Sequence, residues 1–420
     1  MKKGSLMVLV VLFSSMLFAE EGTIRLNELL NLARERNPKI KALKNEVDAY
    51  VYKIPQQKSL PDPMVGLSFQ NMGLNRITIG EEVMSGIGLS FTQALPFPGK
   101  LRLKGEIAEK AYERKRENLN AVELGVLKDV KLSYFELFSL YKSVEILLKQ
   151  KALLEKALSL TETKYAVGSG VQSDIFKAQV EISRMDEMIT PMRQMIDSLR
   201  AKINLLLDFP PEKPLGMPEE MEVYGLEPAL QDIQKAAIEN SPLVKEAALM
   251  VLEGSKMVDL SKKERYPNFV LEGGWDFKGK LPDMYEVMVG VEIPLYFKTK
   301  QAKMLEESLA GLRSSRNNLT STKNDISFMI TESFLKAKTS ENLIQLYKDK
   351  IIPQASLAVE SSLANYQVNK IDFLSLLNDI NTLFSYQMVY YRELTQLWSS
   401  IAQLEEQSAQ VIVNWGGKNE

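Results

Sequence analysis

The longest hydrophobic pattern in the chain predicts one very long helix. Between Gly99 and Pro191 the sequence contains no proline, and apolar residues recur at steps of three and four from Leu119 to Tyr165. This spacing places the apolar residues on one face of an α-helix. At about 1.5 Å per residue, a helix over residues 100–167 would be roughly 100 Å long. A compact domain cannot enclose such a helix, so an elongated molecule is expected.

The chain then turns back at Gly168-Ser169-Gly170. Glycine adopts the positive φ that ends many helices, and Ser173 or Asp174 can cap the N-terminus of the next helix. The return helix is expected to begin at Ile175. The sequence therefore predicts a helical hairpin that ends at Asp208.

The same hairpin pattern occurs twice. Tyr165 aligns with Tyr366, and from there Gly168 aligns with Asn369 without a gap. Five upstream residues match in order and spacing: Leu26, Leu29, Ala33, Asn37 and Pro38 correspond to Leu230, Ile233, Ala237, Ser241 and Pro242. A self-similarity of about two hundred residues indicates a duplicated half and not a solenoid. We therefore predict two repeats, 24–208 and 228–408, joined by a proline-rich linker over 209–227.

Two prolines interrupt otherwise continuous helical patterns. Pro191 lies in the return helix of the first hairpin, and Pro353 lies in a long helix of the second half. A proline inside a helix removes one backbone hydrogen bond and clashes with the preceding turn. Each is therefore expected to bend its helix.

Two short stretches in each half change from a helical period to alternation. Alternation of apolar with small or polar residues is typical of a β-strand with one apolar face. It occurs over 64–72 and 83–93, and again over 269–277 and 287–293. The residues expected on the apolar, lipid-facing side are Leu67, Phe69, Ile87, Leu89, Phe91, Leu271, Trp275, Val289 and Val291. The chain is thus predicted to be mainly α with a small β part of four strands.

These strands fit either a soluble sandwich or an oligomeric barrel. Four strands cannot close a barrel within one chain, because transmembrane barrels start at about eight strands. The less apolar face carries Glu272, Asp276 and Glu292, which suit a water-filled lumen better than a dry core. The pattern therefore favours a barrel formed by several copies.

The N-terminus has the form of a secretory signal peptide. Two lysines precede an apolar run from Leu6 to Phe18, and Ala19 is followed by acidic residues. We expect residues 1–19 to be removed, leaving 20–420 as one elongated domain with a loose tail over 409–420. The alternative is a membrane anchor, but the run is shorter than the ~20 residues that a spanning helix needs.

The composition argues against an enzyme and against nucleic-acid binding. The chain has 52 basic and 54 acidic residues, a net charge of −2, no histidine and no cysteine. It offers no excess positive charge for a phosphate backbone, no histidine as general base, and no thiolate or imidazole ligand for a metal. Gly-rich phosphate loops and metal-spaced ligand clusters are also missing from the sequence. No enzymatic activity, cofactor, metal site or nucleic-acid partner is expected.

The order of elements and a few short motifs resemble the outer-membrane efflux channel family typified by TolC. The motifs are Asn37-Pro38, the phrase from Gln93 to Lys100, and the tips Tyr165–Gly168 with Ser173–Ile175 and Tyr366–Val368 with Phe373–Leu374. The phrase Pro96-Phe97-Pro98-Gly99-Lys100 looks like the heavy-metal branch of that family, with its CusC-like and CzcC-like members. In a chain without histidine or cysteine, however, the 19 methionines are more typical of core packing than of metal ligands.

The resemblance implies a homotrimer in the cell outer membrane. Four strands from each protomer would form one twelve-stranded transmembrane β-barrel in contact with outer-membrane lipid, and the helical hairpins would form an α-barrel in the periplasm. The channel would be the passive exit duct of a tripartite efflux or secretion system, joined by a periplasmic adaptor (membrane fusion) protein to an inner-membrane pump. The alternative is that the chain is itself a periplasmic adaptor or a coiled-coil structural protein. Adaptors carry one hairpin in a strand-rich body, whereas two hairpins and few strands are predicted here.

The resemblance also implies two functional regions at the hairpin tips. The adaptor is expected to dock on Val167, Gly168, Ser169, Gly170, Ser173, Val368, Asn369 and Lys370. The periplasmic gate is expected to involve Asp174, Asp372, Ser375, Asn378 and Asp379. The family's gate positions fall on Ser375 and Asn378, which carry no charge, whereas Asp372 and Asp379 are seven residues apart and share a helical face. In the alternative interpretation Asp372 is an N-cap and Asp379 belongs to a solvated face.

Overall fold

The computed structural model describes residues 22–73, 78–221 and 224–415. The predicted signal peptide lies outside these residues. The chain divides into two compact units, one made of residues up to 41 with 122–241 and 326 onward, and the other of 42–121 with 242–325. Each unit is therefore built from segments of both halves of the sequence.

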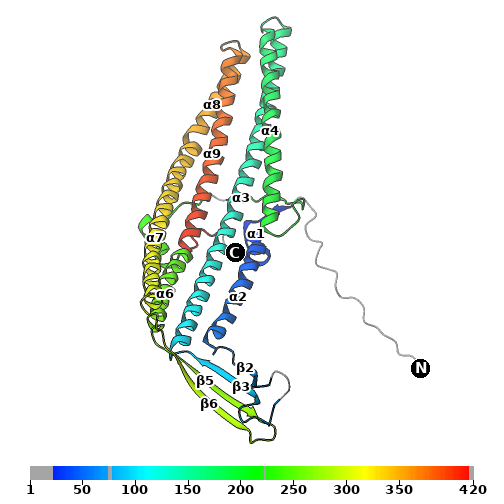
Figure 1. Ribbon diagram of the computed structural model, residues 1–420. Coiled ribbons are helices and arrows are strands. Elements are labelled where there is room, and N and C mark those ends of the chain that lie inside the picture. The colour runs from blue at the N-terminus through cyan, green and yellow to red at the C-terminus, as the bar shows by residue number, and fades with distance from the viewer. Residues whose placement is uncertain (1–21, 74–77, 222–223, 416–420) are drawn as a thin grey trace, which may run out of the picture. The chain divides into compact units, whose positions relative to one another are not determined.

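The helices follow the same order in both halves of the chain (Figure 1). In the first half they are α1 (Leu26–Arg36), α2 (Pro38–Lys58), α3 (Lys100–Ala166) and α4 (Gln172–Leu206). In the second half they are α5 (Leu230–Asn240), α6 (Pro242–Lys263), α7 (Gln301–Leu346), α8 (Ile352–Gln367) and α9 (Phe373–Ser408). The predicted long helix is confirmed, and it ends one residue earlier than expected. In the described part of the chain, no helix is both long enough and apolar enough to cross a membrane.

The breaks between the first two helices of each half have the same backbone geometry. Asn37 has φ −55° and ψ 123°, and Ser241 has φ −55° and ψ 124°. Each residue precedes a proline, which forces the preceding residue out of the helical region. The Asn37 side chain also accepts a hydrogen bond from the backbone N–H of Lys39 (3.0 Å) and donates one to the Leu206 carbonyl (2.8 Å). The motif Asn37-Pro38 therefore ends one helix, begins the next and contacts the end of α4.

The two hairpin tips also share one backbone geometry. Gly168 has φ +74° and its counterpart Asn369 has φ +58°, values that glycine and asparagine tolerate best. In each tip the next residue closes the turn by donating its backbone N–H to a carbonyl five residues earlier, at 2.8 Å for Ser169 and 2.9 Å for Lys370. This is the hydrogen bond that typically follows the end of a helix.

The return helix of the first tip starts earlier than the sequence indicated. It begins at Gln172 after an extended Val171, so the prediction of a cap at Ser173 or Asp174 is wrong. Asp174 instead lies in the first turn, where its negative charge interacts favourably with the positive end of the helix dipole. In the second tip, Asp372 is the N-cap of α9 and accepts a hydrogen bond from the Ser375 N–H at 2.8 Å.

The four strands predicted from the sequence form one sheet. The order is β2 (Met64–Gln70), β3 (Gly86–Leu95), β5 (Asn268–Phe277) and β6 (Met284–Glu292), with every neighbouring pair antiparallel. The two strand pairs predicted from the sequence, β2 with β3 and β5 with β6, are therefore joined into one sheet by the pairing of β3 with β5. A separate two-residue pairing links β1 (Thr23–Ile24) with β4 (Met217–Pro218) in parallel, which attaches the linker to the start of the chain.

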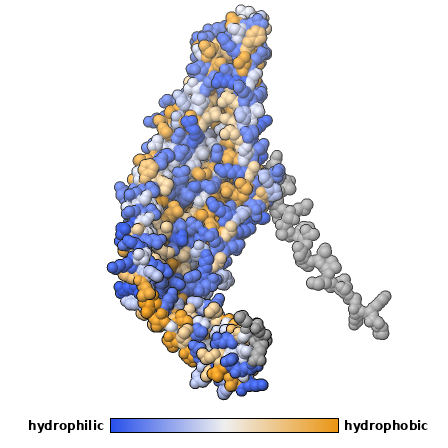
Figure 2. Space-filling model, in the orientation of Figure 1, coloured by the Kyte–Doolittle hydropathy of each residue, from blue (hydrophilic) through white to orange (hydrophobic). Residues whose placement is uncertain are grey.

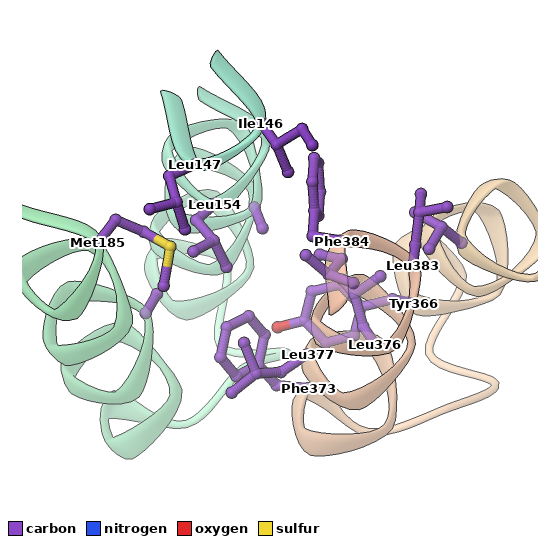
Figure 3. Packing of buried hydrophobic residues seen from close by; sticks show 14 of the residues in the cluster. Ile146, Leu147, Leu154, Met185, Tyr366, Phe373, Leu376, Leu377, Leu383 and Phe384 are labelled. Atoms are coloured by element: carbon purple, nitrogen blue, oxygen red, sulfur yellow. The ribbon is translucent and has the colours of Figure 1, made fainter. Parts of the chain in front are cut away.

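The core between the two hairpins is built from α3, α4, α8 and α9 (Figure 3). Leu147 and Leu154 of α3 pack with Phe373 and Leu376 of α9, and all four are at most 1% exposed. Met185 of α4 belongs to the same cluster. The stripes that the helical periodicity predicted therefore meet in one shared core between the hairpins.

The end of the chain is held in place as far as Trp415, so the prediction of a loose tail from residue 409 is wrong for its first part. The buried Glu405 carboxylate accepts hydrogen bonds from the backbone N–H of Ile412 (2.9 Å) and of Val413 (3.0 Å) and from the Trp415 indole (2.8 Å). Lys131 pairs with the same carboxylate at 2.6 Å. A buried carboxylate with four donors is satisfied, and it fixes the tail against α3. Residues 416–420 lie outside the described residues.

The two interrupting prolines have different surroundings. Pro191 lies inside the continuous helix α4. Pro353 lies at the start of α8, directly after a π-helical turn over Tyr347–Ile351. A π-turn accommodates a proline that cannot donate to the preceding turn. The helix type therefore changes next to Pro353, and the bend expected at each proline stays a prediction.

Candidate functional site

The register of the sheet brings the nine predicted apolar residues onto one face. Directly opposed residues on neighbouring antiparallel strands point to the same face. Leu67 opposes Leu89, Leu89 opposes Trp275, and Leu271 opposes Val289. Phe69 opposes Ile87, and Val291 opposes Phe269. Phe91 opposes Gly273, which in turn opposes Val287. The face assignment made from alternation therefore agrees with the register.

This face is uncovered within one chain. Phe69 is 65% exposed, Trp275 56% and Val289 70%. Figure 2 shows hydrophobic residues gathered over the strands, while the helices carry a mixed and more hydrophilic surface. Monomeric soluble proteins rarely expose a contiguous apolar surface of this kind, and such surfaces mark contact with lipid or with another protein. The soluble-sandwich alternative would bury this face in a second sheet, but β2, β3, β5 and β6 form a single layer whose apolar side chains are exposed.

The opposite face is polar and is lined by small residues and carboxylates. Gln70 donates to Asp276 at 3.2 Å, and Asn268 donates to Glu292 at 3.0 Å. Ser90 lies over Gly66, where an added methyl group would come within 2.7 Å of the serine hydroxyl. Glycine at this position leaves room for the polar side chain of the neighbouring strand. This face therefore presents hydrogen-bonding groups and negative charge to its surroundings.

The predicted docking residues are at the exposed ends of the two hairpins. Val167 is 73% exposed and Val368 is 61% exposed. Gly168, Ser169, Ser173, Asn369 and Lys370 are exposed too, and Gly170 is half-buried. A Cβ atom at Gly170 would lie 3.0 Å from the backbone nitrogen of Tyr165, so this glycine is needed by the turn itself.

The predicted gate residues are separated by the structure into two groups. Asp372, Ser375 and Asn378 are exposed at the start of α9. Asp379 is half-buried and accepts a hydrogen bond from the Ser362 hydroxyl of α8, and Asp174 pairs with Lys177 at 3.2 Å. Asp372 is therefore open to solvent, whereas Asp379, seven residues further along, is partly covered by α8, and the gate itself stays a prediction. The alternative interpretation of Asp372 as an N-cap is confirmed, and the hydrogen bond with Ser375 lowers the pKa of its carboxyl.

A contact between the tips was missed by sequence reasoning. The Lys164 ammonium of α3 donates to the backbone carbonyl of Tyr366 in α8, and Asn381 of α9 accepts a hydrogen bond from Gln150 of α3 at 2.8 Å. Lys164 lies on the same helical stripe as the buried Leu154 and Thr161. A lysine on an otherwise buried stripe is the signal that could have revealed this contact.

The described part of the chain offers no metal site built from side chains. Across these residues there is no cluster of three or more histidine, cysteine, aspartate or glutamate side chains with suitable spacing. The exposed apolar sheet face and the hairpin tips are therefore the candidate functional surfaces.

Comparisons with known proteins support one family. Residues 29–198 match the family described as outer membrane efflux protein. The chain is 22% identical over 399 residues to the cobalt-zinc-cadmium resistance protein CzcC of Cupriavidus metallidurans, covering 91% of this chain and 90% of that protein. It is 19% identical over 434 residues to the outer membrane protein TolC of Vibrio cholerae, covering 96% and 95%.

Solved structures share the fold. The crystal structure of CusC matches with a TM-score of 0.79 at 14% identity, covering 91% of this chain and 92% of that chain. The outer membrane protein VceC of Vibrio cholerae matches with a TM-score of 0.78 at 14% identity, covering 91% and 95%. The resemblance stated from the sequence motifs is thereby confirmed. Over residues 29–198 the chain matches the outer membrane efflux protein family.

Proposed function

We propose that the protein is the outer-membrane channel of a tripartite efflux or secretion system. It conducts passively the substrates that an inner-membrane pump expels through a periplasmic adaptor. The observation that carries this proposal is the sheet with one uncovered apolar face and one polar face. A single layer of this kind suits a wall between lipid and water.

The sheet also supports a homotrimer. Within one protomer β2 and β6 are the edge strands, and their unpaired backbone groups would be costly in lipid. Pairing β2 of one protomer with β6 of the next removes every edge when the ring closes. Three protomers then supply twelve strands, which is within the range of transmembrane barrels.

The polar face supports conduction with a preference for cations. The strands place four carboxylates on it, from Glu272, Asp276, Glu286 and Glu292, and in the described strands no lysine or arginine accompanies them. Rings of carboxylates favour cations in a water-filled channel. The matched CzcC is named for resistance to cobalt, zinc and cadmium, and divalent cations are accordingly one cargo class that we propose.

The helical part supports the same assignment. The matched geometry at Asn37 and Ser241, and at Gly168 and Asn369, supports an internal duplication with repeats 24–208 and 228–408. In the proposed assembly the hairpins form the periplasmic α-barrel. Their exposed tips dock the adaptor, and the start of α9 with Ser375 and Asn378 lies at the periplasmic mouth.

Fractionation and conductance test this function together. The full chain, expressed with its own N-terminus, is expected in the outer-membrane fraction as a trimer on an unboiled gel. The purified trimer should conduct in planar bilayers with a preference for potassium over chloride. A soluble periplasmic monomer without conductance would instead support the adaptor or the coiled-coil structural protein.

A further inference from the structure

The turn between β6 and α7 exposes aromatic and apolar side chains next to lysines. Leu295 is 82% exposed, Tyr296 77% and Phe297 45%. Lys298 and Lys300 follow directly and are also exposed. The turn is ordered by its backbone, since the N–H of Lys300 donates to the Tyr296 carbonyl at 2.9 Å and that of Ala302 donates to the Phe297 carbonyl at 2.8 Å. We call residues 293–300 the basic turn.

The equivalent turn of the first half uses the same residue types inside the fold. Pro96 and Lys100 have the four-residue spacing of Pro294 and Lys298. Lys100, however, is 2% exposed, pairs with Glu264 at 2.9 Å and donates to Asn268 at 2.9 Å. Phe97 stacks on Tyr266 with ring centres 4.6 Å apart. The first turn therefore holds this junction together, whereas among the residues that the structure describes no ion pair or ring contact holds the side chains of the basic turn.

The charges of the basic turn need an anionic counterpart. Among the described residues neither Lys298 nor Lys300 has an ion-pair partner. Both precede α7, which has no acidic residue in its first turn. Positive charge at the start of a helix is unfavourable in water, because the helix dipole is positive there. The arrangement becomes favourable when negative charge lies opposite the turn.

The apolar residues of the turn point to a membrane as the source of that charge. They continue the apolar sheet face through Val291, which is 49% exposed, and Ile293, which is 64% exposed. A tyrosine beside exposed aliphatic residues suits the boundary between acyl chains and headgroups. Lysines placed just beyond such a belt can extend to lipid phosphates. In Figure 2, hydrophobic residues give way to hydrophilic ones where the strands meet the helices.

We propose that the basic turn is a docking surface for anionic phospholipid headgroups at the membrane face that borders the helices. Leu295, Tyr296 and Phe297 enter the interface, and Lys298 and Lys300 contact the phosphates. This inference rests on the proposed function, because it places the adjoining sheet face in the bilayer.

The test measures lipid binding to the full-length trimer in neutral detergent by native mass spectrometry. The probes are short-chain phosphatidylglycerol and, as the zwitterionic reference, phosphatidylcholine. Each lysine near a charged membrane surface contributes about five-fold in affinity. The double variant Lys298→Gln with Lys300→Gln should therefore bind phosphatidylglycerol about 30-fold more weakly and phosphatidylcholine unchanged.

A matched control is present in the same chain. Lys348 and Lys350 are exposed lysines with the same spacing in the π-helical turn. Lys348→Gln with Lys350→Gln should leave phosphatidylglycerol binding at the wild-type value. Equal loss in both double variants would overturn the proposal, because it would reflect net charge alone.

Two further outcomes would also overturn it. Full competition by inorganic phosphate at the lipid concentration would identify a free-anion surface instead of a membrane contact. Loss of trimer with unchanged lipid binding per trimer in the Lys298→Gln, Lys300→Gln variant would assign the turn to a second copy of the chain. Conductance of the same wild-type preparation separates the two proposals. A conducting trimer without preference for phosphatidylglycerol refutes only the lipid contact. A preparation that never conducts refutes the proposed channel.

Discussion

Lys164 at the end of α3 lies over Tyr366 at the end of α8, with its ammonium nitrogen 3.9 Å from the ring centre, and donates a hydrogen bond to the Tyr366 carbonyl. The two residues are 7% and 4% exposed. Burial lowers the pKa of the Lys164 ammonium, and the nearby Asp174 carboxylate opposes this effect. Burial, with a smaller effect of Asp174, raises the pKa of Tyr366 to about 12. This contact joins the tips of the two hairpins within one protomer.

Removing the ammonium should loosen the second tip. Lys164→Met keeps most of the stem but loses the donor to Tyr366, and a hydrogen bond to a charged group is worth about 1.5–3 kcal/mol. Part of this loss is offset because no buried charge remains to be desolvated. Hydrogen exchange of the backbone over residues 366–373 should rise by roughly tenfold. In the control Lys156→Met, an exposed lysine of the same helix is removed and exchange at 366–373 should stay at the wild-type rate. Equal exchange in both variants would mean that the contact does not hold the tip.

Tyr134 should make the stability of the folded protein decrease at alkaline pH. Its buried hydroxyl donates to the Ile24 carbonyl and accepts from the Glu219 N–H, both at 2.9 Å. Burial raises its pKa to about 12, and the hydrogen bond from Glu219 acts weakly in the opposite direction. The unfolded chain therefore loses this proton at lower pH than the folded one. The associated stability is complete below pH 10 and is lost between about pH 10 and pH 12, a change of roughly 2.7 kcal/mol.

The variant Tyr134→Phe tests this pH dependence. At pH 8 it should be less stable by about 1–3 kcal/mol, because two buried backbone groups lose their partner. Its stability should then fall less between pH 10 and pH 12 than that of the wild type. Urea unfolding of the detergent-solubilised protein, followed by helical circular dichroism at each pH, measures both effects. Tyr165→Phe, an exposed tyrosine of the same helix, is the control. Parallel stability curves for wild type and Tyr134→Phe would contradict the assignment.

The two faces of the sheet should respond differently to arginine. Leu89→Arg and Val289→Arg place a charge on the face assigned to lipid, at a cost of about 2–4 kcal/mol at mid-depth. Ser90→Arg and Gly290→Arg place it on the polar face, where water solvates it. We expect the first pair to reduce trimer in the outer membrane and the second pair to assemble with altered conductance. If neighbouring residues tolerated arginine equally well, the sheet would not separate lipid from water.

The hairpin tip offers a cleaner test at Ser169 than at Gly170. A bulky residue at Gly170 would collide with the backbone of Tyr165 and distort the turn, whereas Ser169 is exposed. Ser169→Phe should abolish adaptor binding and efflux while the amount of trimer in the membrane remains normal. Pull-down of the adaptor by the purified channel gives the readout. Normal recovery of adaptor with Ser169→Phe would place the contact elsewhere.

Most of the local structure could be predicted from the periodic spacing of apolar residues. The last residue of α3 was predicted to within one position, because the apolar stripe and Gly168 mark the same end. The faces of β2, β3, β5 and β6 were predicted correctly, since alternation decides the face even where the ends of strands shift by a few residues. The cap of α4 was missed because Val171 has no side-chain acceptor, and Ser173 satisfied the usual rule instead.

Contacts between segments distant in sequence could not be predicted from periodicity. The pairing of β3 with β5 and the hydrogen bond from Lys164 to Tyr366 join residues that are far apart in sequence. Glu405 resembled any charged residue on a helix, yet three hydrogen bonds from the tail converge on its carboxylate. Such convergence depends on tertiary packing, which no single-residue pattern encodes.

At the proposed periplasmic mouth, Asp372 and Asp379 should contribute unequally to ion selectivity. Asp372 is exposed, whereas Asp379 is half-buried and bound by the Ser362 hydroxyl. In a trimer, three exposed Asp372 carboxylates would favour cations. Asp372→Asn removes this charge and keeps the helix cap, because asparagine caps as well as aspartate. Potassium selectivity and block by divalent cations in planar bilayers should both decrease for Asp372→Asn and remain close to wild type for Asp379→Asn.

The pH dependence of this selectivity follows from the hydrogen bond between Asp372 and Ser375. The bond holds the pKa of the Asp372 carboxyl below its ordinary value. The Asp372 carboxylate therefore stays charged at a pH where an ordinary aspartate takes up a proton. Its charge and its contribution to the α9 cap are lost only when the pH falls through the lowered pKa. Selectivity should accordingly persist in the wild type at pH 3.8, where an ordinary aspartate would be half protonated. Ser375→Ala removes the hydroxyl, which lowers this pKa most, and keeps the backbone donor, so this variant should lose selectivity at a higher pH than the wild type. A wild-type channel that loses its selectivity well above pH 3.8 would show that other carboxylates line the mouth.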